Sequence, residues 1–251
     1  MIVLLSPAKS LDFESPAISD KISEPLFPDE TSELLKVLSK LSANDLQGLM
    51  SISPALAELN YNRFREMKDF PSEVPGKQAI LVFVGEVYRG LSAGDFSEDD
   101  LQFAQKHLRI LSGFYGVLRP MDLIQPYRLE MSTKLKIGKH DNLYKFWGDK
   151  ITYQINKDLL NSVIVNLASD EYFKSVNKKL LQTEVITPVF YDQYKGKYRM
   201  LTVYAKNARG AMTRYIIKNR VENHEELKNA GINGYKYSPE MSDKWKWVFK
   251  R

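Results

Sequence analysis

The sequence contains no cysteine. This absence excludes disulfide bonds, a catalytic thiol, thiolate zinc sites and cysteine-ligated iron–sulfur clusters. Histidine is almost as scarce, because His107, His140 and His224 are far apart and form no H-x-x-H or H-E-x-x-H pattern. No metal site is therefore predicted. The sequence also lacks a Walker A segment, a G-x-G-x-x-G segment after a strand, and G-x-S-x-G, so no cofactor is predicted and the common nucleotide and hydrolase mechanisms have no signature.

Long apolar runs are missing as well. No stretch approaches the roughly 20 residues of a membrane span. The opening Met1–Leu5 is too short for a signal peptide, lacks a basic leader and runs directly into Ser6 and Pro7. We therefore expect a cytoplasmic protein with no membrane partner.

The remaining composition is that of an ordinary globular protein. The chain has 251 residues, of which 43% are apolar and 27% charged. A chain of this length can bury a sizeable core. Because no repeat, low-complexity tract or Gly/Ser linker marks a boundary, residues 1–251 are predicted to form a single domain.

Short apolar runs and helical spacings alternate along the chain. Runs rich in β-branched residues predict strands over 2–5, 79–84, 163–167 and 245–250, and a hairpin over 184–204 that turns at Tyr194–Lys197. Apolar spacing and capping residues predict helices over 31–49, 97–111, 147–160 and 208–220, and one that begins at Pro54. This order predicts a mixed α/β fold with central strands and flanking helices.

The charge is unevenly distributed. The net charge of +5 combines a net −5 over residues 1–60 with a net +9 over residues 172–220. Folding can gather the basic segments into one surface, which suits a polyanionic partner. Solvated lysines scattered over separate faces are the alternative, and charge alone does not decide between them.

Two closely spaced glycines, Gly113 and Gly116, lie in RILSGFYGVLRPMDLIQPYR at 109–128. A helix that ends near Leu111, a glycine turn and a helix that restarts at Val117 form a helix–hairpin–helix outline, in which the backbone can approach a phosphate. That motif usually has one residue between its glycines, and here there are two. A plain glycine turn that ends a helix explains Gly113 equally well.

The most basic stretch, residues 195–220, holds eight positive side chains and no acid. On a helical wheel one arc is largely apolar, with Ala208, Met212 and Tyr215 on it. The opposite arc carries Arg209, Arg214, Lys218 and Arg220. The apolar arc can dock on the core while the basic arc faces phosphates or simply solvent.

Polar side chains follow two of the predicted buried strands. Lys9 comes shortly after the first strand, and Ser169, Asp170 and Glu171 follow the strand over 163–167. Positions beyond the carboxyl end of a buried strand suit a ligand site, in which the two acids could serve as acid–base groups or hold a cation. Alternatively, Ser169 caps a short helix whose first turn favours the acids, and Lys9 is an ordinary surface lysine.

Six segments, in order along the chain, resemble the bacterial peroxide stress protein YaaA family. They are SPAKSLDF at 6–13, QAILVFVGEVYRGL at 78–91, LRILSGFYGVLRPMDLIQPYRLEM at 108–131, LYKFWGDKI at 143–151, NLASDEYFKSV at 166–176 and AKNARGAMTRYIIKNR at 205–220. The resemblance spans essentially the whole chain. Two small departures are Ser10 in place of threonine and Asn207 in place of a second basic residue.

This resemblance implies a cytosolic protein of the hydrogen peroxide response that limits unincorporated iron and so protects DNA and protein. It also implies a mixed α/β fold with a basic cleft and a helix–hairpin–helix element that binds double-stranded DNA. None of the iron or peroxide biology follows from the residues themselves.

Two functional hypotheses follow, and the balance of the patterns favours a binding protein over an enzyme. The first is duplex DNA binding through phosphates, with the contacts supplied by Gly113, Gly116, Arg119, Arg128, Lys174, Lys206, Arg209 and Arg214. The second is an enzyme that acts on a phosphorylated or nucleotide substrate in the same cleft, with Lys9, Asp170, Glu171 and Tyr172 as reactive groups. An adaptor that binds proteins through the acidic residues 1–60 is a third alternative.

Overall fold

The computed structural model describes residues 1–69, 76–159 and 163–251. Its centre is an eight-stranded sheet with the order β11–β12–β9–β8–β1–β5–β6, and β10 pairs with the far end of β9. The strands are β1 (Ile2–Leu5), β5 (Leu108–Ser112), β6 (Gly116–Leu118), β8 (Ile164–Asn166), β9 (Val185–Tyr194), β10 (Lys197–Arg199), β11 (Lys236–Tyr237) and β12 (Lys246–Lys250). The five strands from β12 to β5 run parallel, and β6, β10 and β11 are antiparallel to their neighbours. The predicted mixed α/β class is confirmed.

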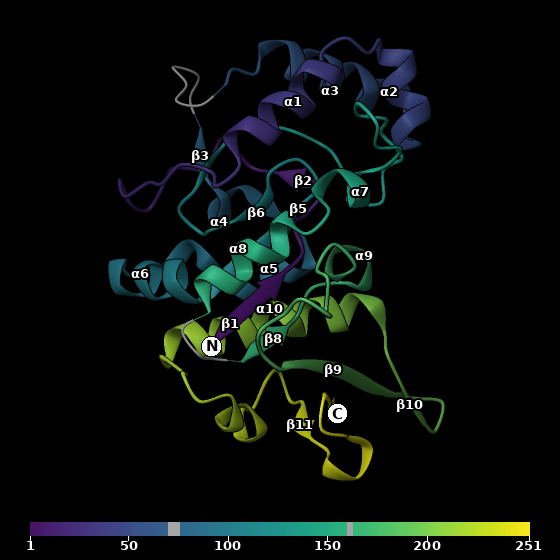
Figure 1. Ribbon diagram of the computed structural model, residues 1–251. Coiled ribbons are helices and arrows are strands. Elements are labelled where there is room, and N and C mark those ends of the chain that lie inside the picture. Colours follow the sequence, from purple (N-terminus) through teal and green to yellow (C-terminus); the bar gives the residue numbers. More distant parts are fainter. Residues whose placement is uncertain (70–75, 160–162) are drawn as a thin grey trace.

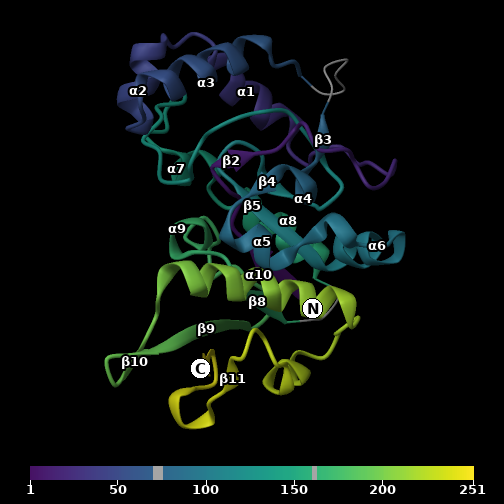
Figure 2. The ribbon, with the colours of Figure 1, turned by 180° about the vertical axis from the view of Figure 1, so that it is seen from behind.

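Helices cover both faces of this sheet. They are α1 (Pro28–Leu38), α2 (Ala43–Met50), α3 (Pro54–Glu66), α4 (Ala79–Val82), α5 (Glu86–Leu91), α6 (Glu98–His107), α7 (Leu143–Trp147), α8 (Lys150–Asp158), α9 (Asp170–Phe173) and α10 (Thr202–Lys218). Helix α8 lies in front of the sheet in Figure 1, and the long helix α10 lies in front of it, beside α5, in the reverse view of Figure 2. Helices α1–α3 gather at one end of the molecule, far from β11 (Figures 1 and 2).

Two short strand pairs complete the structure. Strand β2 (Ser10–Leu11) pairs with β4 (Phe83–Val84), and β3 (Lys77–Gln78) pairs with β7 (Leu123–Ile124). Among the described residues, no helix combines the length and the apolar character needed to cross a membrane.

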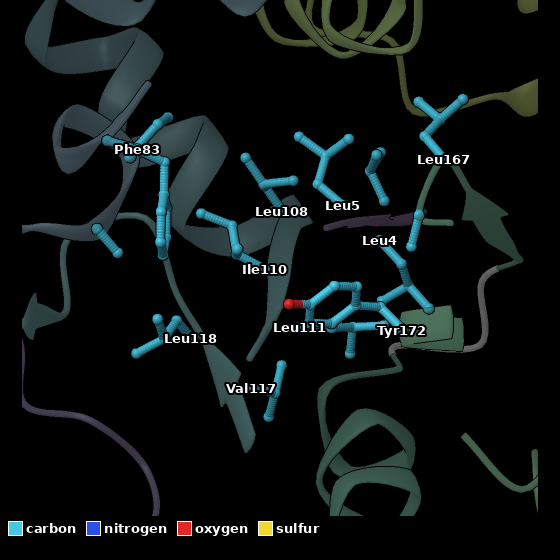
Figure 3. Packing of buried hydrophobic residues seen from close by; sticks show 14 of the residues in the cluster. Leu4, Leu5, Phe83, Leu108, Ile110, Leu111, Val117, Leu118, Leu167 and Tyr172 are labelled. Carbon is cyan, nitrogen blue, oxygen red and sulfur yellow. The ribbon is translucent and has the colours of Figure 1, made fainter. Parts of the chain in front are cut away.

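The core forms around β1, whose four residues IVLL are all buried. Because β1 is paired on both sides and covered on both faces, an unbroken apolar run is the pattern expected of it. Figure 3 shows Leu4 and Leu5 among Ile110 and Leu111 of β5, with Leu167 near the end of β8. This buried layer places the loops that follow β1 and β8 at the same edge of the sheet.

Several predicted elements are confirmed. The strands over 2–5, 163–167 and 245–250 form as β1, β8 and β12, and the predicted hairpin turns between β9 and β10. Its second strand ends at Arg199 instead of reaching residue 204, because residues 202–204 begin α10. The capping box of Ser97 and Asp100 starts α6, and the Ser53 hydroxyl accepts from the N–H of Leu56 at the start of α3. The helix predicted over 208–220 forms as the longer α10. The helix predicted over 147–160 forms as α8, and residue 160 lies outside the described residues.

Other elements differ from the prediction. The run 79–84 forms the single turn α4 followed by the two-residue strand β4, because a short apolar run carries no period that separates helix from strand. The helix predicted over 31–49 divides into α1 and α2, since Ser42 caps a new helix through Asp45. The helix predicted to reach Leu111 ends at His107, where β5 begins.

The helix–hairpin–helix prediction for residues 109–128 is wrong. The segment forms the β-hairpin β5–β6, and the turn residues Phe114 and Tyr115 are fully buried. Their N–H groups donate to the Ser112 hydroxyl at 3.2 and 3.0 Å, so neither of these two N–H groups is free for a phosphate. The cause is the pairing of β5 with β1, which draws the segment into the centre of the sheet.

Both glycines of this hairpin have packing roles. A Cβ on Gly113 would lie 2.4 Å from the carbonyl oxygen of Leu129, and Gly116, at a φ of +70°, lies against the ring of Trp147. The indole N–H of Trp147 donates to the carbonyl oxygen of Gly113 at 2.9 Å. We therefore assign Gly113 and Gly116 to the core and remove them from the candidate DNA contacts.

Candidate functional site

The loops after β1 and β8 meet at the carboxyl edge of the sheet. Ser6 follows β1 and Ser169 follows β8, and the N–H of Ser169 donates to the Ser6 hydroxyl oxygen at 2.8 Å. The two hydroxyl oxygens are 3.2 Å apart, with Ser6 donating to Ser169. The phenol of Tyr88, on α5, donates to the carbonyl oxygen of Ser6 at 3.0 Å. Neighbouring parallel strands place their following loops together, which is why these distant segments converge.

A cavity of about 420 Å³ opens at this edge. Its floor and walls come from the loops after β1 and β8 and from α5, α9 and α10. Apolar and aromatic side chains alternate there with six charged ones. The charged side chains are Lys9, Glu86, Glu130, Glu171, Lys206 and Arg209.

The three carboxylates of the cavity are already engaged. Glu130 binds Lys9 at 2.7 Å and Arg128 at 3.3 Å. The Glu171 carboxylate accepts hydrogen bonds from the N–H and the hydroxyl of Ser132 at 3.2 and 2.8 Å. Glu86 is paired with Arg89, one turn further along α5, at 2.6 Å. Each of these acids therefore has at least one partner within the protein.

Two of the three cations are not engaged. Among the residues that the structure describes, the side chains of Lys206 and Arg209 form no ion pair and no hydrogen bond. Lys206 is exposed at the mouth of the cavity, whereas Arg209 is half-buried. Burial lowers the pKa of the Arg209 guanidinium, and the charge of Asp170 opposes this effect from a greater distance. An unpaired, partly desolvated guanidinium attracts an anion.

The candidate reactive groups are only partly brought together. Lys9, Glu171 and Tyr172 line the cavity, while Asp170 is exposed and does not line it. The Tyr172 phenol is buried, and burial raises its pKa far above the ordinary value, so it stays protonated at neutral pH. Burial raises the pKa of Tyr88 as well. Both phenols therefore present neutral hydroxyl groups.

The remaining candidate DNA contacts separate into two kinds. Lys174, which follows α9, lies over the Tyr144 ring with its ammonium 5.0 Å from the ring centroid and has no acidic partner within the described residues. Arg128, by contrast, is mostly buried beside Glu130. Arg119 lies elsewhere and is held by the buried carboxylate of Asp122.

The basic arc of α10 is largely neutralised by acids from another part of the chain. Arg214 forms two hydrogen bonds to the Asp95 carboxylate, at 2.7 and 2.6 Å. Lys218 and Arg220 both pair with Asp100 on α6, at 2.7 and 2.8 Å. Among the residues that the structure describes, Arg209 is the one side chain of this arc that forms no ion pair, and it faces the cavity.

This ion-pair cluster makes a pH-dependent contribution to stability. Burial opposes ionisation of the Asp100 carboxyl, but hydrogen bonds from Lys218, Ser97 and Arg220 outweigh it and hold its pKa well below the ordinary value. A carboxyl with a lowered folded-state pKa stabilises the fold above its unfolded pKa of about 3.9, and that contribution is lost as the pH falls below this value.

Replacing Asp100 with asparagine is therefore expected to lower the free energy of unfolding by about 2–3 kcal/mol at pH 7. The difference from the original protein should shrink steadily as the pH falls from about 4 to 2. Urea unfolding at several pH values measures both effects. The matched control is Asp99→Asn on the exposed face of α6, which should cost almost nothing. A penalty for Asp100→Asn that stays constant down to the lowest pH would contradict this account.

Sequence reasoning missed Glu130 and Tyr88, which lie in segments where no motif points to the cavity. Lys9 and Glu171 were found because they follow buried strands. Among the described residues, no group of three or more His, Asp or Glu side chains lies close enough to hold a metal ion.

These features define a mixed α/β protein with a ligand-sized cavity at the carboxyl ends of parallel strands. Comparison with known sequences gives the particular family: a family model described as peroxide stress protein YaaA matches residues 1–241. A UPF0246 protein of Tolumonas auensis is 48% identical over 254 residues, covering 100% of this chain and 98% of its own length. A UPF0246 protein of Teredinibacter turnerae is 46% identical, covering 100% and 99%. The chain belongs to the YaaA family, which supports a role in peroxide stress.

Proposed function

We propose that this protein binds duplex DNA during peroxide stress through backbone phosphates, on the surface formed by α9 and the first half of α10. Three candidate cations support this proposal, because within the described residues Lys174, Lys206 and Arg209 have no acidic partner in ion-pair distance. Helices α9 and α10 lie side by side in both views of Figures 1 and 2. Alongside DNA binding, we propose the limit on unincorporated iron that the family resemblance implies.

The other candidate cations contribute less to this proposal. Arg119, Arg128 and Arg214 each hold a carboxylate of the protein itself. Releasing such a pair costs the energy of the internal interaction, so a phosphate gains little by replacing it. The proposed interface thus has about three phosphate contacts, and such contacts position the duplex without reading its bases.

The number of contacts sets the expected salt dependence. With about three phosphates neutralised, the logarithm of the association constant should fall against the logarithm of salt concentration with a slope of about −3. Affinity should therefore drop about 40-fold between about 50 and 200 mM salt. Fluorescence anisotropy with a labelled duplex measures this slope. A slope near zero would show that the protein does not bind through phosphate contacts, and absence of binding would contradict the whole proposal.

Replacing Lys174 and Lys206 together with glutamine should make the slope shallower by about 2 and weaken binding at low salt by at least about tenfold. The matched control replaces Lys36 and Lys40 with glutamine, so that the protein loses the same number of positive charges. Lys36 lies on α1 and Lys40 just after it, and both are exposed at the far end of the molecule. The control should bind DNA as the original protein does. Equal losses of DNA affinity in both variants would show that only net charge matters. An unchanged salt slope in the Lys174 and Lys206 variant would show that these two lysines do not contact phosphates.

A further inference from the structure

The cavity at the ends of β1 and β8 shares Arg209 and, at its mouth, Lys206 with the proposed DNA surface, whereas Lys174 does not line it. We propose that it binds a small organic phosphate of nucleotide size, with Arg209 holding the phosphate and the apolar walls holding the body of the ligand. This inference does not depend on DNA binding, because it rests on the residues that line the cavity and is tested with small phosphates alone.

The size and position of the cavity are those of a small-molecule site. Its volume of about 420 Å³ falls in the usual range of about 300–1,000 Å³ for ligand pockets. Its location beyond the carboxyl ends of two parallel strands is the common ligand position in open α/β sheets. A duplex is too wide to enter, so the interior requires a smaller ligand.

The phosphate end of the site is defined by Arg209. Its planar guanidinium can donate two parallel hydrogen bonds to phosphate oxygens, and no internal carboxylate within the described residues occupies it. Lys206, one turn earlier along α10, adds a second unpaired charge at the mouth. The Ser169 hydroxyl accepts from Ser6, which leaves its own proton free to donate to a ligand oxygen.

The apolar part of the lining suits a ligand body that is partly apolar and partly hydroxylated. Val84, Val87 and Leu167 contribute apolar wall, and the buried rings of Tyr88 and Tyr172 lie among them. Inorganic phosphate would leave these walls uncovered. A nucleoside covers them, which is the chemical reason for choosing a mononucleotide.

The carboxylates of Glu130 and Glu171 complete the pattern. Each keeps acceptor capacity beyond its partners, since a carboxylate has about four acceptor positions. Sugar hydroxyls or an exocyclic amino group supply the donors that such acceptors need. A groove that served only a polyanion would gain nothing from acids at its wall, whereas a site for a phosphate joined to a polar, donor-bearing body does.

Isothermal titration calorimetry with AMP, ribose 5-phosphate and inorganic phosphate tests the inference. We expect AMP to bind more tightly than ribose 5-phosphate, and inorganic phosphate to bind least tightly, with an AMP dissociation constant below about 1 mM. Arg209→Gln should weaken AMP binding at least about tenfold. The matched control Arg214→Gln removes the same charge from α10 at a side chain that Asp95 occupies, and it should bind AMP normally.

A second variant tests the cavity without changing any charge. Ala8 lies in the cavity wall, and Ala8→Phe fills the space while Arg209 stays in place. This variant should lose AMP binding and retain the salt dependence of DNA binding, so failure of one proposal is distinguishable from failure of the other. Thermal unfolding confirms that each variant is folded before its titration is read.

Three results would overturn the inference. They are no heat with AMP at millimolar concentration, equal affinity for AMP and inorganic phosphate, and unchanged AMP affinity in folded Arg209→Gln and Ala8→Phe. Absence of DNA binding together with intact AMP binding would contradict only the proposed DNA surface and would support the cavity as a phosphate site.

Discussion

Replacing Gly210 with alanine is expected to lower the free energy of unfolding by about 3 kcal/mol or more, which corresponds to a fall in melting temperature of about 6–12 °C. The reason is the contact between α5 and α10. A Cβ on Gly210 would lie 1.7 Å from the carbonyl oxygen of Val87, and a Cβ on Gly90 would lie 2.0 Å from the carbonyl oxygen of Asn207. Both obstacles are backbone atoms, so the helices themselves would have to separate.

This contact also shapes the cavity, because Val87 of α5 and Arg209 of α10 line it from the two helices. Separating the helices is therefore expected to weaken AMP binding as well as stability. The matched control is Gly48→Ala within α2, where an added Cβ meets nothing within 4 Å. That change should be neutral or stabilising by up to about 1 kcal/mol, because alanine favours the helix over glycine. Thermal and urea unfolding compare the two, and equal midpoints would show that α5 and α10 are not in direct backbone contact.

Replacing Asp122 with alanine is expected to cost about 3–5 kcal/mol, the range for breaking a buried ion pair by removing one partner. The carboxylate is fully buried and accepts hydrogen bonds from the Ser23 hydroxyl at 2.6 Å, from the Arg119 backbone N–H at 2.8 Å and from the Arg119 side chain at 3.0 Å. Burial raises the pKa of Asp122, and the same hydrogen bonds oppose that rise. Its removal leaves three donors without their acceptor.

Urea unfolding at neutral pH measures this loss. Asp99→Ala, at an exposed position of α6, serves again as the control and should change stability by less than about 0.5 kcal/mol. A loss for Asp122→Ala as small as that of the control would show that Arg119 does not need its partner. Arg119 would then return to the set of cations available for phosphate.

The contrast between Arg209 and Arg214 shows why a basic stretch is an incomplete guide to a basic surface. Both arginines lie on one helix in a run with no acid of its own. Asp95 and Asp100 come from more than 100 residues earlier in the sequence, and they reach α10 only because α6 and the turn before it fold beside that helix. Local sequence carries no record of such distant pairing.

The hairpin around Gly113 is a second case. The residues of β5 follow a well-capped helix and continue its apolar spacing, so local pattern favours a longer helix. Pairing with β1 offers a complete set of backbone hydrogen bonds at the centre of the core, and this non-local gain overrides the local preference. The two positions that suggested a phosphate-binding turn require glycine for another reason, because Leu129 and Trp147 approach them too closely for a side chain.

The sequence by itself determined the fold class, the central buried strands, the long helix near the carboxyl end and the family. These features follow from hydrophobic runs, capping residues and six ordered segments, which can be recognised from neighbouring residues alone. It also pointed to the ends of β1 and β8 as a ligand position. Only the tertiary structure decided which charges are free, since a charge is neutralised by whatever folds against it. Within the described part of the chain, the carboxyl end of this basic stretch is neutralised by Asp95 and Asp100, whereas Arg209 forms no ion pair and faces a cavity.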